Sequence, residues 1–344
     1  MTSQSQTPTW FVPQLVVGCG GVGYDFLKHY IARLLELPKT LADLLIAMLR
    51  HYDTDEKALY AGNRDFRQLQ EFYPKEHLAS RLTDPADRQA LEDAGLLIPT
   101  IKDTESGMSQ LPFLSSLLCV LYHDEIESKV RRFLRQGFGS LGMLGQALSQ
   151  QGYAVHQRSI VYVIFGSGGG TGPGFGQRIG EILRSIKSQG SMPSSTIIGL
   201  VPLASVYEID EERMSRAMAI NHALLLSMSP KMRGDAYTMP VLQGRKIRNC
   251  ELSGLFDFLV LFGPGQDREL LSYENVIHQM VELAWQTGLG GAGVDFLSML
   301  ANEVLVTESN PMAGEYERKQ NHRFHGRAAR NGRSRAGVSA RTHH

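Results

Sequence analysis

The sequence has little of several features that would assign it quickly. Only three of its 344 residues are cysteines, and Cys19, Cys119 and Cys250 lie too far apart for a zinc motif or a dense disulfide framework. No apolar run approaches the roughly 20 residues that span a bilayer. The first ten residues, "MTSQSQTPTW", lack the basic and apolar regions of a secretory signal. These absences predict a cytoplasmic protein with reduced thiols and no membrane span.

Net charge is absent as well. The chain has 35 basic and 35 acidic residues, so its overall charge favours neither nucleic acid nor an anionic membrane as a partner. Residues 308–344 differ, because they are rich in Arg, Gly, Ser and His and show no apolar periodicity. We expect a disordered basic tail there, the one segment suited to nucleic acid or an acidic surface.

Apolar runs alternate with helical patterns along most of the chain. Strands are expected at 11–17, 159–165, 195–204 and 255–263, and helices at 24–37, 210–228 and 273–289. A further helix is expected after the glycine loop at 166–174 and ends near Ser188. In 41–59 helix and strand cannot be separated by periodicity, and 62–135 are mostly helical in pattern. Strands that alternate with helices predict an α/β fold, a doubly wound parallel sheet covered on both faces. Ligands bind such sheets at the carboxyl ends of the strands.

Glycine is abundant where several of these elements meet. "GCGGVG" follows the first strand, "GFGSLGMLG" begins at Gly137, and "GSGGGTGPG" occupies 166–174. Glycine loops before a helix expose backbone N–H groups at the positive end of the helix dipole, which favours phosphate. No Gly-Lys-Ser/Thr follows the longest loop, which argues against the Walker type of NTPase. The pattern predicts three phosphate loops on one sheet edge.

The first glycine cluster, taken alone, leaves another function open. "LVVGCGGVG" fits a Rossmann dinucleotide pattern through Gly18, Gly20 and Gly23. Together with "YDTDEKALYAGNRDFRQ" it also resembles the adenylating enzymes that activate ubiquitin-like proteins. Either interpretation makes Asp53 or Asp55 a ribose or metal ligand.

The loop at 166–174 favours a different family. It resembles the tubulin signature Gly-Gly-Gly-Thr-Gly-Ser-Gly, as varied in FtsZ. "GCGGVG", "YDTDEKAL", "GFGSLGMLGQ", "VPLASVYEIDEERM" and "GLGGAGVDFLSM" resemble further FtsZ segments in the family's order, although Asp53 stands where FtsZ has Asn. The resemblance covers about residues 10–305. It indicates a divergent bacterial tubulin-like protein.

The resemblance implies GTP or GDP with Mg²⁺ as the ligand. In this assignment the first and third glycine loops bind the α- and β-phosphates, and Gly137–Gly142 contact the γ-phosphate. Arg213, with Glu208 or Asp210, contacts the ribose, and Tyr273 and Asn275 contact guanine. The nucleotide site assigned in this way comprises Gly20, Gly21, Val22, Asp53, Gly137, Gly139, Gly168, Gly169, Gly170, Thr171, Gly172, Glu208, Arg213, Tyr273 and Asn275.

Hydrolysis in this family needs carboxylates from the loop after the central helix. Asp295 matches the first of these positions and is the one catalytic residue assigned, whereas Ser298 occupies the second. Because serine is a poor base at neutral pH, we expect nucleotide binding with weak or no GTPase activity.

The resemblance also divides the chain. Residues 1–288 correspond to the GTPase domain with its central helix, 289–307 to the catalytic-loop segment, and the family's second domain is expected to be missing or truncated. An apolar stripe on the central helix, Val276, Met280, Leu283 and Ala284, would then be exposed. We therefore expect self-association, in this family into cytoskeletal filaments.

Overall fold

The computed structural model describes residues 9–99, 111–192, 194–263 and 272–309. The chain divides into two units, residues 1–291 and 292–344. The basic tail expected at 308–344 lies outside the described residues, apart from its first two positions, which end helix α11 (Gly293–Ser309) in the second unit.

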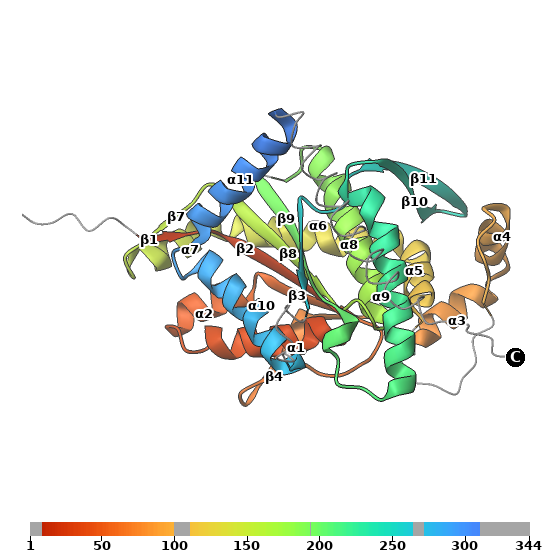
Figure 1. Cartoon of the computed structure of the whole chain (residues 1–344), viewed down its shortest axis with the longest axis horizontal. Helices are drawn as coiled ribbons and strands as arrows, with labels where there is room; N and C mark the ends of the chain where they lie inside the picture. The colour runs from red at the N-terminus through yellow and green to blue at the C-terminus, as the bar shows by residue number, and fades with distance from the viewer. Residues whose placement is uncertain (1–8, 100–110, 193, 264–271, 310–344) are drawn as a thin grey trace, which may run out of the picture. The chain divides into compact units, whose positions relative to one another are not determined.

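The first unit contains a six-stranded parallel sheet (Figure 1). Its order is β12-β9-β8-β2-β3-β6, and each neighbouring pair is parallel. The strands are β2 (Gln14–Cys19), β3 (Leu49–Asp53), β6 (Gln70–Phe72), β8 (Ser159–Phe165), β9 (Ser195–Pro202) and β12 (Phe258–Phe262). The fully buried run at 159–165 is typical of a central strand in such a sheet. The predicted α/β class with a parallel sheet is confirmed.

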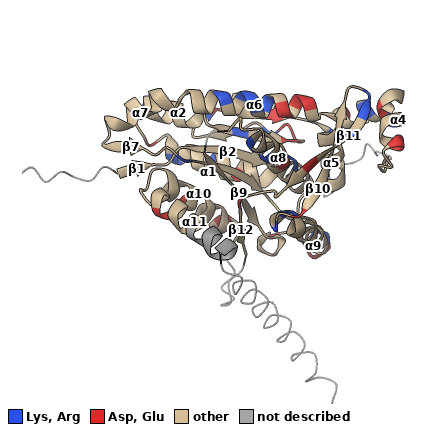
Figure 2. Ribbon diagram, turned by 90° about the horizontal axis from the view of Figure 1, so that it is seen from above, with Lys and Arg blue, Asp and Glu red and all other residues tan. Residues whose placement is uncertain are grey.

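Helices cover both faces of this sheet. On one face α1 (Gly20–Leu34) and α10 (Tyr273–Gly288) pack together, and the Tyr162 hydroxyl of β8 lies 2.8 Å from the Thr287 hydroxyl of α10. On the other face Leu15 and Val17 join the core formed by α5 (Pro112–Leu121), α6 (His123–Gly139) and α8 (Thr171–Ser188). Figure 2 shows α6 and α10 on opposite sides of the strands. The sheet is therefore doubly wound.

The remaining described elements lie around this core. The helices are α2 (Lys39–Ile46), α3 (Lys75–Thr83), α4 (Pro85–Asp93), α7 (Leu141–Ser149) and α9 (Glu211–Met232), with single 3-10 turns at Arg67–Leu69 and Ala204–Val206. The short strands are β1 (Thr9–Phe11), which pairs with β7 (Tyr153–Val155), and β4 (Tyr60–Ala61), which pairs with β5 (Arg64–Asp65). An antiparallel hairpin, β10 (Ala236–Gln243) and β11 (Lys246–Ser253), precedes β12. No described helix is long and apolar enough to cross a membrane.

The glycine cluster at 137–146 is not a loop at the carboxyl edge of the sheet, and that prediction is wrong. Gly137 and Gly139 belong to α6, and α7 begins two residues later. A Cβ added to Gly137 would lie 2.7 Å from a methyl carbon of Leu15, near the amino end of β2. The amphipathic spacing of Ile126, Val130 and Phe133 carries the helix through this glycine, which permits close packing on the sheet.

The apolar stripe of the central helix is buried. Val276, Met280 and Ala284 are fully buried in α10, and Leu283 is half-buried. The helix packs on the sheet through this face, so the stripe needs no partner to exclude water. The expectation of an exposed stripe is therefore wrong, and it no longer argues for self-association.

Candidate functional site: a cavity at the carboxyl edge of the sheet

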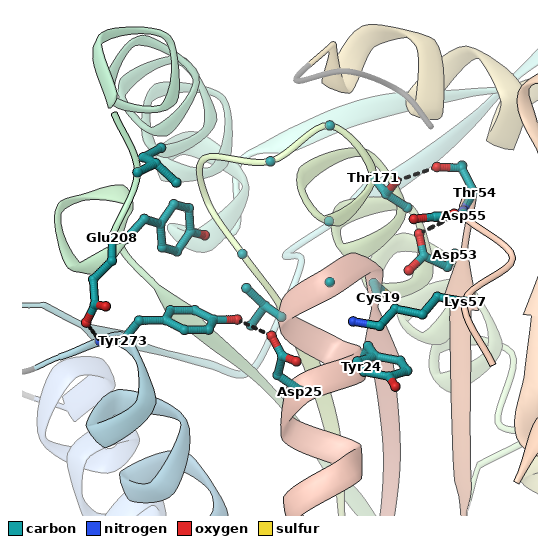
Figure 3. Close-up of a pocket in the computed structure, with 18 of the residues that line it drawn as sticks. Cys19, Tyr24, Asp25, Asp53, Thr54, Asp55, Lys57, Thr171, Glu208 and Tyr273 are labelled. Atoms are coloured by element: carbon teal, nitrogen blue, oxygen red, sulfur yellow. Dashed lines mark hydrogen bonds between the residues drawn. The ribbon is translucent and has the colours of Figure 1, made fainter. Parts of the chain in front are cut away.

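A cavity of about 930 Å³ opens where β2 and β3 end (Figure 3). Its volume falls in the range of small-molecule and cofactor sites. Its described lining comes from the starts of α1, α8 and α10, from the loop between β8 and α8, from the β3–β4 connection and from the segment after β9. The lining residues are Cys19, Gly21, Val22, Tyr24, Asp25, Asp53, Thr54, Asp55, Lys57, Gly166, Gly169, Gly170, Thr171, Gly172, Tyr207, Glu208, Ile209, Ser272, Tyr273 and Glu274.

The first glycine cluster starts α1 directly at the end of β2. Gly20 has a φ of +66°, a left-handed conformation that favours glycine, and a Cβ there would lie 2.9 Å from the Gly172 nitrogen. Gly18 and Gly23 are in backbone contact, which brings the helix close against the strand. The N-cap residue of α1, Cys19, makes no side-chain hydrogen bond to the helix amides. Its first amides therefore face the cavity without an internal acceptor.

The loop at 166–172 starts α8 beside α1. A Cβ on Gly168 would meet Ala204, Ala217 and Tyr207 within 3 Å, so this glycine packs inward, whereas Gly169 has open space on the cavity side. The N-cap residue of α8 is Gly170, which has no side chain to cap the helix. Two uncapped helix amino termini thus converge on one cavity, an arrangement that favours a bound anion through amide donors and helix dipoles.

Hydroxyl groups connect this loop to its neighbours. The Thr54 and Thr171 hydroxyl oxygens lie 2.6 Å apart, which joins the end of β3 to the start of α8. The Ser115 hydroxyl lies 2.8 Å from the Gly170 carbonyl oxygen, to which it donates. These bonds hold the α8 loop from both sides and preorganise the edge of the cavity.

One end of the cavity is aromatic. The rings of Tyr207 and Tyr273 meet edge to face with centroids 5.8 Å apart. The Tyr273 hydroxyl donates to Asp25 at 2.8 Å, and its backbone N–H donates to Glu208 at 3.3 Å. Burial raises the pKa of Tyr207 to about 12, so this phenol is neutral at physiological pH. Flat neutral rings next to carboxylate acceptors suit a planar base with N–H donors.

At the opposite end, Asp53 lines the cavity and forms a buried pair with His51, which lies behind the lining. His51 Nε2 donates to the Gly20 carbonyl oxygen at 3.0 Å, because Nδ1 accepts from the Gln70 amide at 3.1 Å. Asp53 Oδ1 accepts the N–H groups of Thr54 and Asp55 at 2.7 and 3.3 Å. Burial lowers the pKa of His51 and raises the pKa of Asp53, and their mutual attraction opposes both shifts only in part.

The charge of the lining is mostly negative. Five carboxylates face one ammonium, that of Lys57; the acids are Asp25, Asp53, Asp55, Glu208 and Glu274. The Cys19 thiol is neutral, because burial raises its pKa well above the ordinary value. Across the described residues no cluster of three or more His, Cys, Asp or Glu side chains is placed to hold a metal ion. The magnesium ion that the resemblance implies would be held mainly by the phosphates, and it stays a prediction.

The structure brings most of the residues assigned from the sequence to this cavity. Those that line it are Gly21, Val22, Asp53, Gly169, Gly170, Thr171, Gly172, Glu208 and Tyr273. Gly20 and Gly168 lie behind the lining, where Gly20 contacts Gly172 and the Gly168 N–H donates to the Tyr207 hydroxyl at 3.4 Å.

Five assigned residues lie elsewhere. Gly137 and Gly139 are in α6, as described above. Arg213 lies outside the lining, paired with the α9 cap Asp210 at 3.3 Å. Asn275 lines a separate cavity between α1 and α10, because it follows Tyr273 by two residues and so faces away from it. Asp295 belongs to the second unit.

Sequence reasoning missed several lining residues. Tyr24, Asp25, Thr54, Lys57 and Tyr207 all contribute side chains to the cavity. Thr54 and Lys57 stand in the quoted segment "YDTDEKAL", and Tyr207 in "VPLASVYEIDEERM", so their position after predicted strands was the available signal. Tyr24 and Asp25 lie one turn into a helix, where periodicity alone does not show which face meets a ligand.

No protein-family profile matches the chain, and no curated protein matches it in sequence. Several solved structures are similar to it at low identity, among them two TubZ proteins and a CetZ protein. The GDP-form protofilaments of TubZ from Bacillus thuringiensis serovar israelensis share 11% identity over 82% of this chain and 56% of that chain, with a TM-score of 0.39. The monomeric TubZ subunit from bacteriophage PhiKZ shares 10% sequence identity over 79% of this chain and 60% of that chain, with a TM-score of 0.36. CetZ1 from Haloferax volcanii, a GDP-bound monomer, shares 10% sequence identity over 79% of this chain and 58% of that chain, with a TM-score of 0.40. The chain spans less than two thirds of the length of each.

Proposed function

We propose that the chain binds a guanine nucleotide in the cavity at the carboxyl edge of the sheet. The observation that carries this proposal is the convergence of the uncapped amino termini of α1 and α8 on one cavity of about 930 Å³. The phosphates would be held by the amides of Gly21 and of Gly169–Gly172. Glycine occupies all of these positions except Thr171, so the phosphates can approach the backbone amides closely.

The aromatic end of the cavity supports a nucleoside, and its acids favour guanine. The Tyr207 and Tyr273 rings offer flat surfaces, and Glu208 is a carboxylate acceptor next to them. Guanine presents N–H donors on its pairing edge that a carboxylate accepts, whereas adenine presents an acceptor at the equivalent ring position. The tubulin-like sequence pattern points to the same base.

Competition binding tests this function. A fluorescent GTP analogue should bind the purified chain, and unlabelled GTP or GDP should displace it while ATP and NAD do not. Displacement by NAD or ATP in preference to GTP would instead favour the dinucleotide or adenylating alternative. The nucleotide that co-purifies with the chain gives an independent result.

A matched pair of glycine variants ties the binding to this cavity. A Cβ at Gly169 or at Gly139 meets no atom of the described residues within 4 Å, but only Gly169 lines the cavity. Gly169→Leu should therefore abolish nucleotide binding and leave the thermal unfolding midpoint close to that of the unaltered chain. Gly139→Leu should bind as the unaltered chain does. Equal effects of the two variants would place the nucleotide elsewhere.

We further propose that nucleotide binding is coupled to assembly into filaments, with weak or absent hydrolysis. The ordered set of tubulin-like segments supports assembly, and Ser298 at the second acidic position supports weak hydrolysis. Light scattering and electron microscopy with GTP test the first statement, and phosphate release tests the second. An inactive regulator would bind nucleotide and give neither signal.

A further inference from the structure

The lysine at position 57 is the one cationic side chain among the described residues that line the cavity. It belongs to the connection between β3 and β4, not to a glycine loop. The glycine loop at 166–174 lacks the lysine that follows a Walker loop and neutralises the terminal phosphates. A site that binds a triphosphate among five carboxylates needs such a positive charge from another segment.

The backbone around Lys57 is fixed by buried groups. The Gln70 amide donates to the Lys57 carbonyl oxygen at 2.9 Å and accepts the Leu59 N–H at 2.7 Å. The Tyr24 hydroxyl donates to the neighbouring Ala58 carbonyl oxygen at 3.2 Å. This part of the connection is therefore held against the sheet and α1, although the Lys57 side chain is exposed to the cavity.

The ammonium itself has a defined position. It lies 4.2 Å from the centroid of the Tyr24 ring, a cation–π distance. Figure 3 shows it directed into the cavity, at the end that contains Thr54 and Thr171. Glu208 and Tyr273 lie at the other end, across the start of α1. The Tyr207 ring contacts the Tyr273 ring there. A nucleotide with its base on the aromatic rings would extend its phosphates toward Lys57.

We propose that Lys57 contacts the terminal phosphate and makes the site prefer the triphosphate to the diphosphate. This inference rests on the proposed function, because it takes the cavity as a nucleotide site. The diphosphate ends at the helix amides and does not reach the ammonium. Lys57, which does not belong to a glycine loop, thus distinguishes the triphosphate from the diphosphate.

The test is the ratio of the GTP and GDP dissociation constants, measured by calorimetry on the full chain with a non-hydrolysed GTP analogue. Lys57→Met keeps an unbranched side chain of similar length and removes the ammonium that lies over Tyr24. It should weaken binding of the triphosphate by about tenfold or more, as expected for a lost charged hydrogen bond, and that of GDP by less than about threefold. Lys57→Arg should restore most of the preference. Lys28→Met is the matched control, since Lys28 is exposed on α1 and does not line the cavity.

Two failures are distinguishable. If the unaltered chain binds neither nucleotide, the proposed function falls and the role of Lys57 falls with it. If it binds both and Lys57→Met changes their dissociation constants equally or leaves them unchanged, only the role of Lys57 is overturned. If Lys28→Met weakens triphosphate binding as much as Lys57→Met does, the effect comes from the overall charge of the chain. That result would also overturn the proposed contact of Lys57 with the terminal phosphate.

Discussion

Replacing Asp53 by asparagine should strengthen nucleotide binding. The side chain is buried at the end of β3, and its Oδ1 atom accepts two backbone N–H groups, a role that an amide oxygen fills equally well. The substitution therefore preserves the local geometry and removes a carboxylate from a cavity proposed to hold phosphates. Asparagine is also the residue that the tubulin-like pattern has at this position.

The magnitude follows from Coulomb's law. For a carboxylate and a phosphate charge on the order of 7 Å apart, at an effective dielectric constant of about 20, the repulsion is about 2.4 kcal/mol. This corresponds to a change of roughly 50-fold in the dissociation constant for a fully ionised group. Burial raises the pKa of Asp53, and salt screens the interaction, so the gain is largest at low ionic strength and at a pH where the group is ionised.

The assay is titration of a fluorescent GTP analogue at low and high salt, with Asp55→Asn as the matched control. Asp55 also lines the cavity but is exposed to solvent, so its removal should strengthen binding by a smaller factor. Weaker binding by Asp53→Asn with an unchanged unfolding midpoint would refute the reasoning, because it would show that the carboxylate itself contacts the ligand.

Three further predictions concern stability and turnover. His51→Gln should make the free energy of unfolding depend less on pH below pH 6.5, which chemical denaturation at several pH values measures. Burial lowers the folded-state pKa of His51 beneath its ordinary value of 6.5. The stabilisation by neutral His51 is therefore present above pH 6.5 and is lost as the pH falls through the folded-state pKa. Gly176→Ala should destabilise the first unit by about 1–3 kcal/mol in thermal unfolding, because the added Cβ would lie 2.2 Å from a ring carbon of Phe165. Gly145→Ala in α7 is the control: its Cβ would have ordinary contacts, so it should stabilise the chain by up to about 1 kcal/mol. Ser298→Asp should raise GTP hydrolysis by about 10²-fold or more if the segment after the central helix supplies a general base, and no increase in phosphate release would remove that segment from the mechanism.

Most of the sheet could be predicted from the sequence because its central strands are apolar on both faces. The run at 159–165 has the bounds that the structure gives to β8, and the helix expected after the glycine loop ends at Ser188, as α8 does. The hairpin β10–β11 was not predicted, since much of it is exposed and its strands lack a strong alternation. β6 was hidden in a segment taken as mostly helical, because it has only three residues.

The site was predictable where backbone conformation determines it. Gly20 and the loop before α8 are found from the sequence, since glycine there is required by a positive φ and by close packing. Side-chain direction was not predictable: Tyr273 faces the cavity and Asn275 does not, although both open the same helix. Gly137 shows the converse error, because a glycine that allows helix–sheet contact has the same letter as one in a phosphate loop.

Nucleotide binding and the protonation of Asp53 are linked in both directions. A phosphate near this carboxyl group raises its pKa further, so binding takes up a proton wherever the group is ionised in the free chain. By reciprocity the protonated chain binds more tightly, and the affinity of the unaltered chain rises as the pH falls through the pKa of Asp53. Asp53→Asn has no such proton to take up, so its advantage shrinks in the same interval and vanishes below it. The acidic lining is therefore compatible with a phosphate site, because the carboxylate nearest the end of β3 is one whose charge burial already disfavours.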